Sequence, residues 1–285
     1  MNSLTQIGKW KISVIETGSI MLDGGAMMGS VPKVLWEKDN PPDDFNRIKL
    51  AMRCLVLDDG ENLVLIETGI GTKFSNKFKK MFNVKVDKLG LSNTLSKQGY
   101  SHLNITHVVL THLHFDHAGG ATTLNENEDI IPAFPNAKYY VSERNWIAGN
   151  RPNPREKASY LRENFRVLKD SGSLILIPDN CEIIKGISTY SVDGHTTGQQ
   201  LVKIDGDSET IIFCSDLIPL KSHLKLPWIM GYDLNASLTL IEKEKFLNLA
   251  SDKDWILFFY HDPKTIAVKI KKDNNKYVIT DEYSA

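Results

Sequence analysis

The chain has few cysteines, and those it has are poorly placed for disulfide bonds. Its 285 residues include three, Cys54, Cys181 and Cys214, which are far apart and odd in number. This pattern fits reduced thiols better than a disulfide framework. Cys54 and Cys214 lie in apolar, strand-like runs, so we expect both to be small buried side chains.

The sequence also lacks long apolar runs and an excess of charge of either sign. No stretch of 18 or more apolar residues occurs, and the N-terminal MNSLTQIGKW has neither the basic start nor the apolar run of a signal peptide, so we expect a cytoplasmic protein with no membrane partner. Lys and Arg number 34 against 35 Asp and Glu. Because these charges are scattered, we expect no nucleic-acid partner. The basic stretch KFSNKFKK at residues 73–80 is expected to be a solvated face or loop, or else a patch that steers anionic substrates.

No linker rich in Pro, Gly and Ser interrupts the chain, so we expect residues 1–285 to form one domain. Strand patterns dominate, and the turn DDGEN between MRCLVL and LVLIETG predicts a hairpin. Helical patterns occur near residues 91–100, 154–169 and 237–250. Strands in groups with helices between them predict an α/β (α+β) fold with two sheets and helices on the outside.

Residues 22–46, LDGGAMMGSVPKVLWEKDNPPDDFN, are too rich in Gly and Pro for a regular element and long for a connection. The segment and its edge carry flexible apolar side chains: Met21, Leu22, Met27, Met28, Val31, Val34, Leu35 and Trp36. Such a loop either walls an apolar substrate pocket or packs on the sheets or on a second subunit. We therefore expect a small-molecule substrate with an apolar tail, and a homodimer is plausible.

The stretch THLHFDHAGG at residues 111–120 gathers three of the eight histidines and an aspartate within six residues. Imidazoles and a carboxylate suit a borderline divalent metal such as Zn²⁺. In His112-Leu113-His114 the alternation aims both imidazoles the same way, and Asp116-His117 can face a second point nearby. His195, Asp216 and His261 follow other predicted strands, and strand ends are where rigid scaffolds build sites. A histidine-rich loop without catalytic function is the alternative.

The stretch resembles the HxHxDH signature of the metallo-β-lactamase-fold hydrolases. The later segments DGHTTGQ, FCSD and FYHD, at residues 193–199, 213–216 and 259–262, are similar to the family's further motifs and occur in the same order. The resemblance implies a four-layer αβ/βα sandwich of two mixed β-sheets flanked by helices. It also implies two divalent metal ions per chain, most simply Zn²⁺, with Mn²⁺, Fe²⁺ or Co²⁺ as alternatives.

Carried over residue by residue, the resemblance implies two ligand sets and a bridge. One metal would be held by His112, His114 and His195, the second by Asp116, His117 and His261, and Asp216 would bridge them. In one place the chain departs from the family, which usually has an aspartate before Thr-Gly, where this sequence has Glu67. That acid would orient a ligand histidine, or it is an ordinary acid at a strand end.

Two metals close together supply hydroxide at neutral pH and polarise the electrophile, which predicts metal-assisted hydrolysis. Asp116 could shuttle the proton to the leaving alkoxide. LDGGAMMGSVPKVLWEK and SDLIPLKSHLKLPWIMGYD most resemble the branch with quorum-quenching N-acyl homoserine lactonases and methyl parathion hydrolase-like enzymes. Many of these lactonases have a tyrosine where this chain has Pro219, so Tyr232 and His223 are the candidate oxyanion donors.

Three functions compete on the sequence alone. The first is a dinuclear lactonase or related carboxylic-ester hydrolase, in which a metal-bridging hydroxide opens a lactone ring. The second is a phosphotriester, phosphodiester or aryl ester hydrolase on the same centre. The third is a non-hydrolytic mononuclear metal protein, which a metal count per chain would distinguish.

Overall fold

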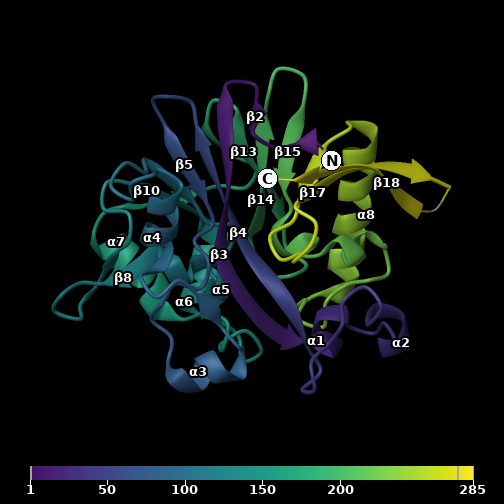
Figure 1. The fold of residues 1–285 in the computed structure, drawn as a ribbon, viewed down its shortest axis with the longest axis horizontal. Coiled ribbons are helices and arrows are strands. Elements are labelled where there is room, and N and C mark those ends of the chain that lie inside the picture. Colours follow the sequence, from purple (N-terminus) through teal and green to yellow (C-terminus); the bar gives the residue numbers. More distant parts are fainter. Residues whose placement is uncertain (1, 275, 285) are drawn as a thin grey trace.

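The computed structural model describes residues 2–274 and 276–284, which form two large mixed β-sheets (Figure 1). In spatial order the first sheet contains β1 (Asn2–Ser3), β18 (Lys276–Ser284), β17 (Ala267–Asp273), β16 (Ile256–Phe258), β15 (Thr210–Phe213), β14 (Gln199–Asp205), β13 (Ile187–Val192) and β12 (Glu182–Ile184). The second contains β11 (Leu174–Ile177), β10 (Lys138–Ser142), β7 (His107–Val109), β5 (Leu63–Ile66), β4 (Arg47–Asp58), β3 (Trp10–Asp23) and β2 (Gln6–Ile7), with β6 (Lys85–Val86) beside β3. A small ribbon pairs β8 (Thr122–Leu124) with β9 (Ile130–Pro132).

Helices lie on the outer faces of both sheets. In Figure 1, α8 (Ala236–Asp252) lies on one side of the sheets, and α4 (Gly90–Lys97), α6 (Glu143–Asn150) and α7 (Arg166–Asp170) lie on the other. The short helices are α1 (Gly24–Met28), α2 (Lys33–Trp36), α3 (Asn76–Met81), α5 (Phe115–Ala118), η1 (Gly119–Ala121), η2 (Arg162–Asn164), η3 (Ser215–Leu217) and η4 (Lys221–Leu224). Within the described part of the chain, no helix has the length and apolar character to span a bilayer.

Three apolar clusters fill the spaces between the layers, and alternation along the strands explains them. In β4, Leu55 and Leu57 face the other sheet, whereas Cys54 and Val56 face the α4 side. The first sheet is also buried on both faces. Ile211 of β15 packs in the cluster between the sheets, whereas Ile212 packs in the cluster that contains side chains of α8. Successive side chains of a strand point to opposite faces, so strands buried on both faces read as nearly continuous apolar runs. The predicted four-layer fold is confirmed, as are the DDGEN hairpin and buried Cys54 and Cys214.

Two expectations for local structure were wrong. Residues 22–46 are not free of regular elements, because β3 extends to Asp23, whose side chain accepts from Ala26 N and caps α1, and α2 follows. The predicted helix over 154–169 is mostly turns, with only η2 and α7 near its end. In its first half the Asn153 carboxamide oxygen accepts from the backbone N–H groups of Arg155 and Glu156, and this local bonding competes with a helix.

Candidate metal centre and active site

The predicted ligands lie where strands end, at one edge of the two sheets. His112 and His114 follow β7, Asp116 and His117 lie in α5, His195 follows β13, Asp216 lies in η3 after β15, and His261 follows β16. β5 runs parallel to β7, and β15 runs parallel to β16. Parallel strands present their carboxyl ends at the same edge, which explains how segments about 150 residues apart supply one site.

The two glycines that end THLHFDHAGG bring this segment close to the strand-end segment after β5. A Cβ on Gly119 would lie 2.1 Å from the carbonyl oxygen of Ile70, and one on Gly120 would lie 2.2 Å from that of Thr68. Only residues without a side chain allow this approach. The glycines therefore set the position of α5, which carries Asp116 and His117.

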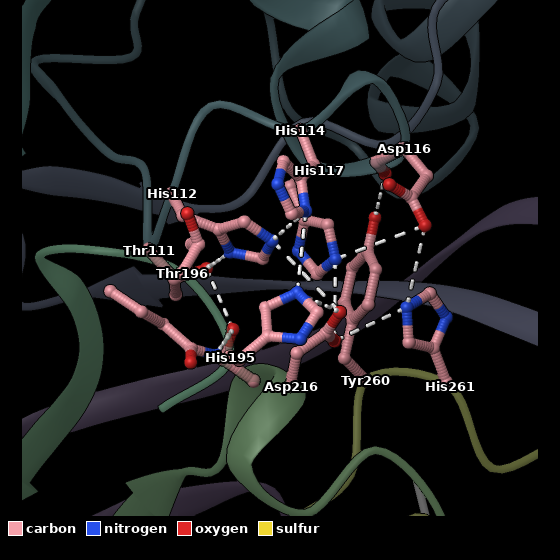
Figure 2. A network of polar contacts seen from close by, with 12 residues as sticks. Thr111, His112, His114, Asp116, His117, His195, Thr196, Asp216, Tyr260 and His261 are labelled. Carbon is pink, nitrogen blue, oxygen red and sulfur yellow. Dashed lines mark hydrogen bonds and ion pairs between the residues drawn. The ribbon is translucent and has the colours of Figure 1, made fainter. Parts of the chain in front are cut away.

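Three imidazoles meet at a first point (Figure 2). Nδ1 of His114 lies 3.1 Å from Nε2 of His112 and 3.3 Å from Nε2 of His195. His112 and His114 thus point to one place, as the alternation in His112-Leu113-His114 predicts. All three side chains are buried.

Asp116, His117 and His261 meet at a second point beside the first. Oδ2 of Asp116 lies 3.6 Å from Nε2 of His261 and 3.9 Å from Nε2 of His117. The hydroxyl of Tyr260 donates to the backbone carbonyl of Asp116 over 2.5 Å, and its ring stacks on His117. These contacts hold α5 against the strand that leads to His261.

The carboxylate of Asp216 lies between the two sets (Figure 2). Its Oδ2 is 3.3 Å from Nε2 of His195 and 3.9 Å from Nε2 of His112. Its Oδ1 is 3.4 Å from Nε2 of both His117 and His261. Because each oxygen faces a different set, Asp216 has the position of a ligand shared by two cations.

The unpaired polar atoms of the cluster fit metal ions. Nε2 of His117 and Oδ1 of Asp216 are both buried and have no hydrogen-bond partner in the described part of the chain. Buried polar atoms left unpaired are costly and rare in folded proteins. Imidazole nitrogens and carboxylate oxygens that converge within 4.8 Å of one another, with no thiolate among them, are a donor set suited to Zn²⁺ or a similar divalent ion.

The protonation of the cluster couples metal binding to pH. Burial lowers the pKa of His112 well below its ordinary value and also lowers the pKa of His114, so both imidazoles are neutral and able to bind a cation. Burial opposes ionisation of Asp216, yet His117 and His261 hold the pKa of its carboxyl well below the usual range. Burial likewise opposes protonation of His117, but the nearby carboxylates, Asp216 foremost, raise its pKa. A proton must therefore leave the cluster when a cation binds.

The second nitrogen of each imidazole faces a partner outside the cluster. Nδ1 of His195 donates to Oδ1 of Asp233 over 2.9 Å, Nδ1 of His261 donates to the Ala51 carbonyl over 2.9 Å, and Nδ1 of His112 lies 3.0 Å from the Thr111 hydroxyl. Nε2 of His114 lies 3.8 Å from Oε1 of Glu156. Such contacts fix the tautomer and the ring orientation of a metal ligand.

Glu67 makes the corresponding contact with His117. It is fully buried, and its Oε2 lies 3.3 Å from Nδ1 of His117 while its Oε1 accepts from the backbone N–H of Thr111 over 2.8 Å. The backbone φ of Glu67 is +66°, which is unfavourable for a residue with a side chain. Such backbone strain persists only where the surrounding contacts hold the residue in place, and it occurs often at functional sites. The placement supports the orienting role over that of an ordinary strand-end acid.

We expect Glu67→Gln to weaken metal binding about 10- to 100-fold, the usual effect of losing such an orienting partner. Glutamine keeps the length of the side chain and can still accept from Thr111, but it lacks the charge that faces His117. The dissociation constant is measured by competition with a chromogenic chelator. Affinity equal to that of the parent protein would contradict the orienting role.

Sequence reasoning missed Asp233 and Glu156 as partners of ligands. Glu156 accepts from the hydroxyl of Thr196 over 2.5 Å, and Thr196 also bonds to Tyr160. Asp233 ends the fragment IMGYD, which had been noted only for its resemblance to a family branch. Both partners are remote in sequence from the histidines they contact, so no local spacing identifies them.

A cavity of about 580 Å³ opens onto both ligand sets. His114, Asp116, His195, Asp216 and His261 line its polar end. The rest is mostly apolar and is lined by Leu22, Met27, Phe78, Met81, Phe82, Phe115, Leu161 and Met230. Such a volume and lining are typical of pockets for small molecules.

The early segment supplies less of this wall than expected. Of the eight apolar residues singled out in or beside residues 22–46, only Leu22 and Met27 line the cavity. Met28 and Trp36 are buried in the core between the sheets, whereas Val34 and Leu35 are 64% and 51% exposed. The homodimer prediction rests on that exposed apolar surface.

The basic stretch at residues 73–80 is a solvated face only in part, because Lys77, Lys79 and Lys80 are exposed whereas Lys73 and Phe78 are partly buried. Phe78 of α3 packs against Phe115 with ring centroids 5.1 Å apart, and it forms part of the cavity wall. Lys73 is not solvated, because its ammonium donates to the carbonyls of Gly119 and Thr122. Burial lowers the pKa of Lys73 to about 8. The periodic phenylalanines at 74, 78 and 82 were the sequence signal for an apolar face.

The structure separates the two candidate oxyanion donors. Tyr232 lines the cavity and is 40% exposed. His223 is buried, is not among the cavity-lining residues, and contacts the Met27 carbonyl through Nε2 at 2.9 Å. Burial lowers the pKa of His223 to about 3, so the ring is neutral and its single N–H is used by Met27. His223 thus has no proton left to donate to an oxyanion.

Arg155 is the single arginine or lysine among the described residues that line this cavity. Its guanidinium donates to the carbonyls of Gly231 and Asp233, on either side of Tyr232. The four motifs that carry the ligands contain no lysine or arginine. Arg155 therefore orders the segment that carries Tyr232 and is already engaged with backbone carbonyls.

The sequence comparisons agree with this geometry. The profile of the metallo-beta-lactamase superfamily matches residues 53–261. An N-acyl homoserine lactonase of a Bacillus species is 24% identical, with 88% of this chain and 93% of the relative covered. A probable metallo-hydrolase of Mycobacterium bovis is also 24% identical, with 77% of each chain covered.

Many solved structures superimpose on this fold. A probable metal-dependent hydrolase from Staphylococcus aureus superimposes with a TM-score of 0.89 at 28% identity, covering 98% of both chains. AidC, a dizinc quorum-quenching lactonase solved with a product, superimposes with a TM-score of 0.77 at 21% identity, covering 98% of this chain and 97% of that one. At 21% identity, the similarity to AidC is a similarity of fold.

Proposed function

The chain belongs to the metallo-beta-lactamase superfamily, and we propose that it is a dinuclear metal-dependent hydrolase that opens lactone rings of the N-acyl homoserine lactone class. The observation that carries the proposal is the carboxylate of Asp216, whose two oxygens face two separate ligand sets beside a largely apolar cavity. The lactonase relatives support the substrate class. The apolar end of the cavity suits an acyl tail.

We propose that His112, His114 and His195 hold one ion, that Asp116, His117 and His261 hold the second, and that Asp216 is shared. Zn²⁺ is the ion that this donor set suits best, with Mn²⁺, Fe²⁺ and Co²⁺ as alternatives. When bound, such a pair lowers the pKa of a water molecule and polarises the substrate carbonyl.

The side chains of the cavity then direct the reaction. Asp116 lines the cavity and accepts the proton that the attacking water gives up, and it returns this proton to the alkoxide that leaves as the ring opens. Phe78 and Phe115 shield the acyl tail from water. Glu67 and Asp233 hold the ligand imidazoles in their tautomers.

Tyr232 replaces the tyrosine that is absent at Pro219. Burial, together with the charges of Asp23 and Asp116, raises the pKa of Tyr232 to about 12, so its hydroxyl keeps its proton at neutral pH. A protonated hydroxyl in the cavity can donate to the carbonyl oxygen as negative charge develops on it.

We expect Tyr232→Phe to lower kcat about 100-fold while KM changes little, because the donor acts mainly in the transition state. The matched control is Tyr190→Phe, which removes a hydroxyl from β13, outside the cavity. Initial rates of lactone opening give both constants. If kcat falls equally in both variants, or in neither, Tyr232 is not the donor.

The substrate class is tested with metal-loaded protein of known metal content. Opening of a long-chain N-acyl homoserine lactone is followed by proton release, beside an aryl phosphotriester and an aryl ester. We expect preferential lactone opening. Turnover of the phosphotriester without lactone opening would instead favour a phosphotriesterase on the same centre.

A further inference from the structure

A second cavity, of about 620 Å³, lies on the helical layer and is bordered by α6, η2 and α7. It shares no lining residue with the cavity at the ligand sets. Arg151, Arg162, Arg166 and Lys169 line it, against a single carboxylate, that of Asp170. The chain as a whole has nearly equal numbers of cationic and anionic side chains, so this is a local concentration of positive charge.

The four cations of this cavity are not neutralised by the protein. None of them forms an ion pair with any residue in 2–274 or 276–284, whereas Arg144 on the same helical layer pairs with Asp179 and Asp193. Cations gathered in a concave site repel one another and raise the local concentration of anions. The arrangement is that of a receptor for a multiply charged anion.

The cavity also has an apolar border. Trp146 and Ile147 of α6 line it, and Ile147 is 56% exposed. Its volume is within the range of small-molecule sites. Phosphate groups suit the arginines because guanidinium groups bind them bidentately, and a flat ring can cover the exposed apolar side chain.

We propose that this cavity binds a polyphosphate, either inorganic or carried by a nucleoside, at a site separate from the metal centre. Arg151 and Arg162 bind it from the two ends of the segment 151–162. Residues between these two ends, among them Arg155, Glu156 and Leu161, line the cavity at the ligand sets. A ligand that joins Arg151 to Arg162 therefore fixes both ends of a segment that shapes the other cavity.

Arg162 makes one hydrogen bond near these ends. The guanidinium of Arg162 donates to the carbonyl of Asn150 over 2.8 Å, and no side-chain contact joins it to Arg151 in the described residues. An anion between the two arginines converts like-charge repulsion into two charge-assisted contacts. We therefore expect slower amide hydrogen exchange across 151–162 when the site is filled.

The test is calorimetric titration of the metal-loaded protein with inorganic triphosphate and, separately, with a nucleoside triphosphate, at low and moderate salt. We expect binding of both, weakened by salt, and at least tenfold weaker in Arg166→Gln and in Lys169→Gln. Lys253→Gln is the matched control, because this lysine follows α8 on the other side of the sheets and has no ion pair in the described chain. Circular dichroism verifies that the variants are folded.

The two ligands distinguish the source of the phosphate. Binding that is at least tenfold tighter for the nucleoside triphosphate supports the site and assigns a role in binding the nucleoside to Trp146 and Ile147. Equal binding supports a site that recognises the phosphate groups alone. Binding of unchanged affinity in both Arg166→Gln and Lys169→Gln would place the phosphate outside this cavity and would overturn the proposal. Absence of binding at millimolar ligand and low salt would overturn it as well.

Discussion

Asp116→Asn and His117→Ala are each expected to lower kcat/KM for lactone opening by at least about 1,000-fold, or roughly 4 kcal/mol of transition-state stabilisation. Both side chains belong to the second ligand set, and Asp116 also carries the proton in the proposed reaction. Asparagine keeps the shape of aspartate but neither the negative charge nor the proton-accepting oxygen. Alanine removes the imidazole that faces Oδ1 of Asp216.

The fold is expected to survive both substitutions, because the sheets are held by apolar clusters that do not include these two residues. Far-ultraviolet circular dichroism should match that of the parent. Metal content should fall toward one ion per chain in His117→Ala. Near-normal turnover in either variant would rule out the two-metal mechanism.

Removal of metal is expected to abolish hydrolysis and to lower the melting temperature. The centre brings two carboxylates and five imidazoles together in a buried place, and cations offset the cost of their unpaired atoms. With free metal at about 1,000 times its dissociation constant, binding contributes about 4 kcal/mol of stability. For a chain of this size that corresponds to a fall of roughly 10 °C on chelation.

Calorimetric scans with and without chelator measure this loss, and readdition of Zn²⁺, Mn²⁺, Fe²⁺ or Co²⁺ then shows which ion restores turnover. Excess magnesium, which prefers an octahedron of oxygens, is the matched control and should restore neither activity nor stability. An unchanged melting temperature after verified metal loss would mean that bound ions do not stabilise the buried polar atoms of the cluster.

Local patterns predicted the strands and the histidine-rich segment because both are recorded in short stretches of sequence, whereas the two ligand sets were implied by the resemblance of the motifs to a known family. The apolar, β-rich runs MRCLVL and LVLIETG are a property of neighbouring residues, and so is the spacing of His112, His114 and Asp116. A predicted strand end also indicates that the residues directly after it lie at the edge of the sheet. The strands and the positions of their ends follow from period and position, but the division of the ligands into two sets does not.

The errors arose where distant parts of the chain decide the outcome. Residues 154–160 carry a helical pattern, yet Glu156 and Tyr160 form the network around Thr196, and that tertiary contact overrides helix propensity. His223 was a candidate oxyanion donor from the sequence, but in the fold the backbone carbonyl of Met27, almost 200 residues away, accepts its N–H. Asp233 similarly meets His195 only in the folded chain.

The most direct test of a two-metal centre is a stoichiometric titration of metal-free protein with Zn²⁺ while lactone opening is followed by proton release. We expect little turnover up to one equivalent and a rise to full activity that ends at two equivalents per chain. Full activity at one equivalent would contradict the two-metal centre, because Asp216 would then have no second ion to share.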